Sequence, residues 1–305
     1  MNGVLLRCRF RKIAASPLNE DFKLNLLYCS SPLKNTDRRK IDHMMKKRYF
    51  AIPILAIALH FFLSNLLYFL VERLVLDVFH IPPQQFMKYS YWGEILIYAV
   101  LILVFFTLYK LLWRKEISEP RTATNFKDVL GSLVVGFGIC GISGLWIMLA
   151  EQLPSLQKSV EAMNAGAENI AGGNAFGTFM IAVIAAPVVE EILFRGIVLR
   201  SMRKFSPAWA SILISSVLFG VYHLNIVQAA YATLMGIAAG ILYEKKRNLL
   251  FPILVHFANN LITMLQGFAP SEVNELISIF ILIMIAPAGY IVCRSLRQDK
   301  RADSM

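Results

Sequence analysis

The residues most able to do chemistry are ionisable side chains inside long apolar segments. Two adjacent carboxylates, Glu190 and Glu191, occur in a run over residues 185–195 that is apolar apart from them and Arg195. A charged side chain at mid-bilayer costs at least ~2.5–3.5 kcal/mol, so its presence there indicates a functional site. Glu191 and Arg195 are four apart and share a helical face, where they can pair. Glu190 points about 100° away, so it can face a cavity and act as a general base.

Polar side chains in two later apolar segments complete a candidate pocket. His223 ends one segment, and His256 and Asn260 lie four residues apart on one helical face of another. If the three segments converge, they form a wet polar pocket that can activate water, bind a metal or pass protons. A lone intramembrane histidine more often makes an interhelical hydrogen bond, but the co-occurrence strengthens every member of the set. His60, in the first apolar segment, has no polar helical neighbour beyond Ser64 and is interpreted as structural.

Three short motifs follow one another along residues 175–265. They are Glu-Glu with Arg four residues after the second Glu, Phe with His four residues later, and His with Asn four residues later. In this sequence they read Glu190-Glu191-Ile192-Leu193-Phe194-Arg195, Phe219 with His223, and His256 with Asn260. In order and spacing they resemble the CPBP family, also called Abi, of intramembrane proteases. That family includes the type II CAAX prenyl endopeptidases and bacterial bacteriocin-processing or immunity proteins.

The resemblance implies hydrolysis of a peptide bond of a membrane-embedded or lipidated substrate, in or beside the bilayer. It implies that Glu190 activates water with support from His223, and that His256 and Asn260 polarise the scissile carbonyl and hold the oxyanion. One preorganised oxyanion donor can contribute ~2.7–4 kcal/mol. The expected catalytic site has five members: Glu190, Glu191, His223, His256 and Asn260. Two further motif residues are expected to support it: Arg195 and Phe219.

A divalent metal is an alternative means of activating the water. The family has also been treated as metal-dependent, and Glu190, His223 and His256 suit Zn²⁺, or another divalent ion, with an open water position. The residues alone do not choose between metal-bound water and water activated directly by Glu190. The interpretation preferred from sequence is a metalloprotease-type site.

Two other classes of function stay open. A proton- or ion-coupled transporter would use the two glutamates and the histidines as a relay, although the internal repeats typical of such transporters are not found. A non-catalytic immunity or scaffold protein would bind without cleaving. Other intramembrane protease types leave different marks, since the sequence has no His-Glu-x-x-His and no Asp within an apolar segment. Residues 141–144 mimic a rhomboid serine motif, but such a match arises easily by chance in a glycine-rich segment.

The elements that must position these residues are apolar segments of about 18 residues or more, long enough to cross a bilayer as helices. The chain of 305 residues is 57% hydrophobic and 17% charged, against roughly 25% charged in a soluble domain. We therefore predict an all-α polytopic membrane helix bundle over residues 49–293. Its eight expected spans lie near residues 49–71, 91–113, 129–150, 175–200, 207–224, 227–244, 249–267 and 273–293.

The net charge of +11 is interpreted as an orientation signal. Lys and Arg collect in cytoplasmic loops. With the N-terminus inside and eight spans, 28 of the 31 basic residues lie on the cytoplasmic side. This predicts an N-in, C-in multi-pass protein, expected in a bacterial plasma membrane, with the lipid bilayer and no nucleic acid as partner.

The two ends of the chain are expected to be cytosolic. Residues 1–48 form a basic arm without a cleavable signal peptide, because four basic residues interrupt its first apolar stretch. Translation starting at Met44 or Met45 is an alternative. Residues 294–305 form a short basic tail.

Small residues in two spans recur at the spacing that lets helix backbones approach closely in lipid. They are Gly136, Cys140 and Gly144 in the third span and Gly236 and Gly240 in the sixth. We expect them to be structural.

The height of His223 conflicts with that of its expected partners. At 1.5 Å per residue, Glu190 and His256 lie about 15 Å and 12 Å from the inner boundary, but His223 lies about 24 Å above it. The fifth span must therefore begin deeper or tilt strongly.

Overall fold

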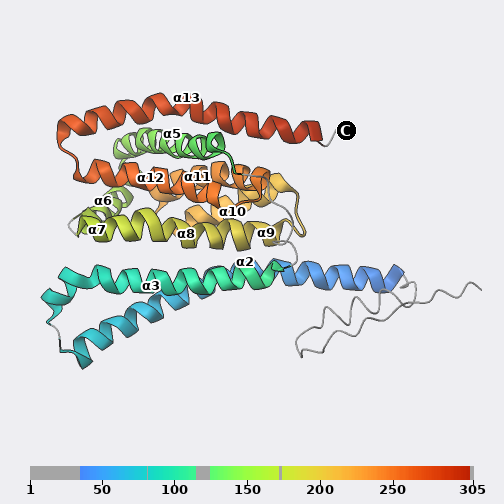
Figure 1. Ribbon diagram of the computed structural model, residues 1–305, viewed down its shortest axis with the longest axis horizontal. Coiled ribbons are helices and arrows are strands. Elements are labelled where there is room, and N and C mark those ends of the chain that lie inside the picture. The colour runs from blue at the N-terminus through green and yellow to red at the C-terminus, as the bar shows by residue number, and fades with distance from the viewer. Residues whose placement is uncertain (1–34, 81, 115–123, 172–173, 303–305) are drawn as a thin grey trace, which may run out of the picture. The chain divides into compact units, whose positions relative to one another are not determined.

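The computed structural model describes residues 35–80, 82–114, 124–171 and 174–302. Most of the predicted N-terminal arm and the last three residues lie outside these ranges. Within them every regular element is a helix (Figure 1), which confirms the predicted all-α class. In chain order the elements are α2 (Asn35–Arg73), η1 (Leu74–Val78), α3 (Pro83–Leu112), α5 (Phe126–Glu151), η2 (Pro154–Leu156), α6 (Gln157–Ala171), α7 (Ala175–Thr178), η3 (Phe179–Ala185), α8 (Ala186–Glu191), η4 (Ile192–Leu199), α9 (Arg200–Met202), α10 (Ala208–Tyr222), α11 (Ile226–Lys246), α12 (Leu250–Phe268) and α13 (Ser271–Ala302).

Five helical stretches of the described chain are long and apolar enough to cross a membrane, which fits a multi-pass membrane bundle. They are Tyr49–Val78, Ser90–Leu112, Phe126–Glu151, Ile226–Lys246 and Ser271–Arg297. The other three predicted spans are also helical, but α10 has only 15 residues and the segment from α7 to α9 is interrupted. The count of eight spans and the N-in orientation stay predictions. Helix α13 continues into the predicted C-terminal tail.

The interrupted segment carries the glutamate pair. The short α-helix α8 lies between two π-helical segments, η3 and η4. Pro187, in the first turn of α8, lies inside a helical stretch that is continuous from Ala175, so its missing N–H leaves a carbonyl of the preceding turn without its helical donor. π-Helical turns within α-helices occur frequently at functional sites. Glu190 and Glu191 therefore lie at the C-terminal end of α8, just before the backbone changes its hydrogen-bonding pattern.

Asparagine side chains define the starts of three helices in the described chain. Asn125 accepts a hydrogen bond from the backbone of Asp128 at the start of α5, and Asn174 accepts two at the start of α7. Asn225 accepts from the N–H of Gln228 at the start of α11. Asparagine is among the best N-cap residues because its oxygen satisfies a free N–H of the first turn.

Packing brings the broken segment into the interior. In Figure 1, α7, α8 and α9 follow one another in a row, while α5 packs against both α12 and α13. The segment η4 contacts α3 on one side and α10 on the other, and α10 packs along α11. The helix with the first motif is thus held between the elements that carry the other two motifs and the second apolar span.

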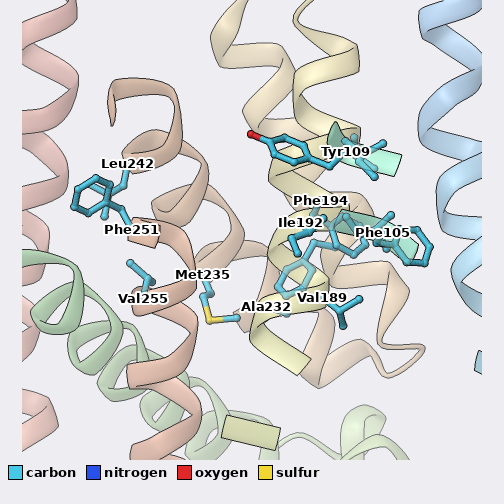
Figure 2. Packing of buried hydrophobic residues seen from close by; sticks show 14 of the residues in the cluster. Phe105, Tyr109, Val189, Ile192, Phe194, Ala232, Met235, Leu242, Phe251 and Val255 are labelled. Atoms are coloured by element: carbon cyan, nitrogen blue, oxygen red, sulfur yellow. The ribbon is translucent and has the colours of Figure 1, made fainter. Parts of the chain in front are cut away.

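One buried cluster joins these elements (Figure 2). It includes Phe105 of α3, Ile192 and Phe194 of η4, and Met235 and Val255 of α11 and α12. In lipid, helices associate through van der Waals packing rather than by leaving water. This close packing fixes α8 and η4 within the bundle, and with them the glutamate pair.

The glycines predicted to lie at helix contacts differ in how closely a neighbouring helix approaches them. A Cβ at Gly136 would overlap the Val255 carbonyl oxygen, and one at Gly236 would come within 2.8 Å of Ser216 Cβ. Nothing lies within 4 Å of a Cβ at Gly144. The predicted packing role holds at Gly136 and Gly236 but is wrong at Gly144, since sequence spacing does not tell which face meets a neighbour.

The variant Gly136→Ala is expected to destabilise the bundle by about 1–3 kcal/mol, the usual cost of an added methyl group in a packed interior. The obstacle is the backbone of α12 rather than a flexible side chain. Gly144→Ala, in the same helix, is the matched control and should leave stability unchanged or slightly raised. Thermal unfolding of both variants in the same detergent measures the effect, and equal midpoints would contradict it.

Candidate active site

Glu191 and Arg195 form a buried ion pair. Arg195 Nη1 donates to Glu191 Oε1 at 2.7 Å, and both side chains are fully buried. The pairing predicted from their four-residue spacing is confirmed. The guanidinium of Arg195 also lies 4.8 Å above the ring of Phe219 on α10, which favours the cation electrostatically. The first motif is thereby joined to the second.

His256 lies between the two carboxylates. Its Nδ1 is 3.1 Å from Glu191 Oε1, and its Nε2 is 3.9 Å from Glu190 Oε2. An ionised carboxylate only accepts hydrogen bonds, so Nδ1 carries the proton that it shares with Glu191. The Nε2 atom consequently faces Glu190, as an acceptor in the neutral ring and as a donor in the imidazolium.

Glu190 has no counterpart to the Arg195 bond of Glu191, and its ion pair among the described residues is the 3.9 Å contact with His256. The side chain of Glu190 is 12% exposed, and its buried Oε2 has no hydrogen-bond partner among the described residues. A buried polar atom without a partner needs an explanation, because its desolvation is otherwise uncompensated. A water molecule or a substrate group at Oε2 would satisfy it. The expected division between a neutralised Glu191 and an available Glu190 matches this geometry.

His223 lies just beyond the C-terminal end of α10. Its Nδ1 is 2.8 Å from the carbonyl oxygen of Phe219, and a carbonyl only accepts, so the proton is on Nδ1 and Nε2 is left as an acceptor. Its ring lies edge-on to Phe219 at 4.9 Å, and Phe219 lies 5.6 Å from His256. The end of α10 thus approaches the other two motifs. The rise counted along the helix had instead placed His223 higher than Glu190 and His256.

Asn260 is held by two hydrogen bonds, one to η3 and one to its neighbour on α12. Its Nδ2 donates to the carbonyl oxygen of Ala182 in η3 at 2.9 Å. Its Oδ1 accepts from Nδ2 of Asn259 at 3.1 Å. Asn259, which lies outside the three motifs, therefore fixes the orientation of the Asn260 amide. The signal that could have pointed to it is a second amide directly beside a motif residue in an apolar helix.

A series of contacts therefore joins the three motifs. His256 lies next to Glu190, Glu191 and Phe219, Arg195 lies next to Glu191 and Phe219, and His223 lies against Phe219. Asn260 is one helical turn from His256 and contacts η3 instead.

The segment that contains all three motifs is also the one that is similar to known proteins. Residues 172–262 match the family model described as type II CAAX prenyl endopeptidase Rce1-like. This segment of the chain is therefore similar to the CAAX/CPBP protease family. Over 91 residues the chain is 29% identical to the putative membrane peptidase YdiL of Bacillus subtilis (strain 168). That alignment spans 30% of this chain and 37% of the relative, and no solved structure matches the chain.

The metal ligands predicted from sequence come from three separate helices of the matched segment or their ends. Among the described residues no three His, Cys, Asp or Glu side chains are grouped so as to hold a metal ion. His256 has one feature typical of metal ligands, a ring Nδ1–H held by a carboxylate, while the ring of His223 lies against Phe219. The ligand set Glu190, His223 and His256 is not assembled in this arrangement.

From the spacing of these side chains we expect purified protein to bind no stoichiometric metal. Elemental analysis of the purified wild-type protein, of His223→Ala and of His256→Ala measures metal content independently of activity. About one equivalent of Zn²⁺ in the wild type, lost in His223→Ala and in His256→Ala, would instead establish the ligand set predicted from sequence.

The loop after His223 is held by the helix α6. Ser159 Oγ donates to Asn225 Oδ1 at 2.8 Å, and Asn225 Nδ2 donates back to the Ser159 carbonyl at 2.8 Å. Trp146 Nε1 donates to the carbonyl of Val227 at 2.9 Å. These contacts fix the start of α11 within the matched segment. Asn225 followed by Gln228 was a capping signature readable in the sequence, but its partner on α6 was not.

Proposed function

We propose that the protein is an intramembrane endopeptidase that hydrolyses a peptide bond of a membrane-associated protein or peptide. The observation that carries the proposal is the carboxylate of Glu190, whose buried Oε2 lacks a partner beside His256. In the adjacent pair, Glu191 is already neutralised by Arg195. The match of residues 172–262 to CAAX prenyl endopeptidases supports the same reaction class.

In the proposed reaction Glu190 accepts a proton from water as the water oxygen attacks the scissile carbonyl carbon. His223 assists through its free Nε2. The tetrahedral intermediate collapses when the C–N bond breaks, and the leaving amine takes up the proton held by Glu190. General bases of this kind typically contribute about 10²–10⁴-fold to the rate.

The oxyanion is proposed to lie between His256 and Asn260. His256, whose Nδ1–H is held by Glu191 Oε1, donates from Nε2 when its ring is protonated. Asn260 Nδ2 has two hydrogens, of which one is bonded to Ala182, so the other is available. Donors fixed before the reaction stabilise developing charge without the cost of reorganisation.

The substrate class follows from the setting of the site. The reacting groups belong to apolar helices of a multi-pass membrane protein, so we propose a substrate that is itself membrane-embedded or lipidated. CAAX processing and bacteriocin processing are the two forms that this takes in the family named above. We propose a bacterial plasma membrane as the location.

The proposal is tested without knowing the substrate. Wild-type protein and Glu190→Gln are produced in the same host, and the peptides released from its membrane fraction are compared by mass spectrometry. Peptides that appear only with the wild type support proteolysis and supply a substrate for kinetics. Identical peptide profiles, with both proteins inserted in equal amounts, would overturn the proposal, and proton-coupled uptake in liposomes would then favour a transporter.

A further inference from the structure

A buried hydrogen bond connects the first span to the end of α10. His60 of α2 is 5% exposed, and its Nδ1 lies 2.9 Å from the hydroxyl oxygen of Tyr222. The two residues are 162 positions apart in sequence. His60 lies outside the segment that matches the CAAX endopeptidase model, so nothing in that match assigns it a role.

The histidine is tightly enclosed. Its ring lies 5.3 Å from Phe105 and 5.6 Å from Tyr222. Its Nε2 is buried without a hydrogen-bond partner among the described residues, while Ser64 contributes only a long contact to Nδ1 at 3.4 Å. Burying an imidazole with one unpartnered nitrogen costs free energy, because that nitrogen loses its hydration without gaining a hydrogen bond. An apolar side chain would fill the same space without this cost, so the bond to Tyr222 is the feature that distinguishes the histidine.

Tyr222 occupies a position that matters for the reacting groups. It is the last residue of α10, directly before His223, and the chain turns left-handed at Leu224, where φ is 55°. Its ring lies 5.4 Å from Phe194, which follows the glutamates in η4, and 4.8 Å from Phe61 of α2. A tyrosine fixed at both its ring and its hydroxyl fixes the last helical turn, and so the direction in which the His223 ring leaves it.

We propose that His60 is a positioning residue of the protease site. By holding the hydroxyl of Tyr222 it fixes the orientation of His223, and the span α2 thereby completes a site whose reacting groups all lie in the matched core. The effect of His60 on catalysis rests on the proposed function. The orientation of His223 by His60 and Tyr222 can be measured without any substrate.

The structural part is tested by chemical modification of histidine. Diethyl pyrocarbonate reacts with accessible imidazole nitrogen, and mass spectrometry reports its rate at each of the five histidines in detergent-solubilised full-length protein. We expect His60→Ala and Tyr222→Phe to change the rate at His223 severalfold while the rate at His80 stays constant. Unchanged rates at His223 in both variants would overturn the proposal.

The catalytic part uses a peptide released by the wild type. His60→Ala and Tyr222→Phe should lower kcat by about 10- to 100-fold, because a reacting group displaced by about 1 Å costs this much, and leave KM nearly constant. The double variant should be no slower than the worse single one, since both remove the same interaction. Independent, multiplying effects, or a rise in KM alone, would contradict a positioning role.

Two further variants separate positioning from general stability. His60→Asn places an amide nitrogen or oxygen where Nδ1 stood and should restore both kcat and the His223 modification rate. Tyr243→Phe removes the hydroxyl of another buried tyrosine, on α11, and should change neither. If the wild type releases no peptide, the proposed function fails. The modification rates still show whether the His60–Tyr222 contact orients His223.

Discussion

The variant Glu190→Gln is expected to abolish cleavage of a membrane peptide while the protein still inserts and folds. The amide has the shape of the carboxylate but cannot accept a proton from water, so the loss should be about 10²–10⁴-fold in kcat. Stability should be unchanged or raised, because the substitution removes a buried charge whose Oε2 has no hydrogen-bond partner. The measurement is the rate at which a released peptide is formed in proteoliposomes, together with the thermal midpoint.

The matched control is Glu244→Gln on α11. Glu244 is also a largely buried glutamate, 7% exposed at its side chain, but it pairs with Arg203 and Arg247 away from the motifs. It should keep cleavage even if it loses some stability. His223→Ala should lose cleavage as Glu190→Gln does. Retained cleavage in Glu190→Gln and His223→Ala together would end the protease hypothesis.

The second large effect is expected on stability, from Arg195→Met. The substitution fills similar volume but leaves Glu191 as an uncompensated charge in an environment where both partners are fully buried. Removing one partner of a buried ion pair typically costs about 3–5 kcal/mol. We therefore expect Arg195→Met to lower the yield of folded protein sharply and to reduce the thermal midpoint in detergent.

A second substitution separates charge from packing. Glu191→Leu combined with Arg195→Met removes both charges, and replacing a buried pair by apolar residues is often neutral or stabilising. The double variant should recover most of the lost stability. It should stay inactive, because His256 loses the Glu191 oxygen that holds its Nδ1. If the double variant recovers no stability relative to Arg195→Met, packing of Arg195 against Phe219 rather than charge balance is decisive.

Much of the site follows from residue spacing. Glu191 and Arg195 are four apart, and that alone predicted the ion pair that the structure contains. The different direction of Glu190 followed from helical geometry. Intramembrane charge is penalised strongly enough that three polar segments in one chain implied a shared interior. His256 between both glutamates is consistent with that expectation.

Other features depend on contacts that no local pattern records. The π-helical segments η3 and η4 interrupt a stretch predicted as one continuous span, and their register is set by packing against α3, α10 and α12. His60 seemed isolated because its partner Tyr222 is on another helix. Gly144 matched the spacing for helix contact but faces open space. In each case the decisive neighbour is remote in sequence.

The brevity of α10 has a consequence for the membrane itself. Fifteen helical residues rise about 22 Å, against a hydrocarbon thickness of about 30 Å. A helix that stops short creates hydrophobic mismatch, which lipids relieve by thinning locally. His223 and the capped turn after it lie where that thinning would bring the polar headgroups closest. The water consumed in the proposed hydrolysis would then reach Glu190 through a dimple in the bilayer, without a pore through the protein.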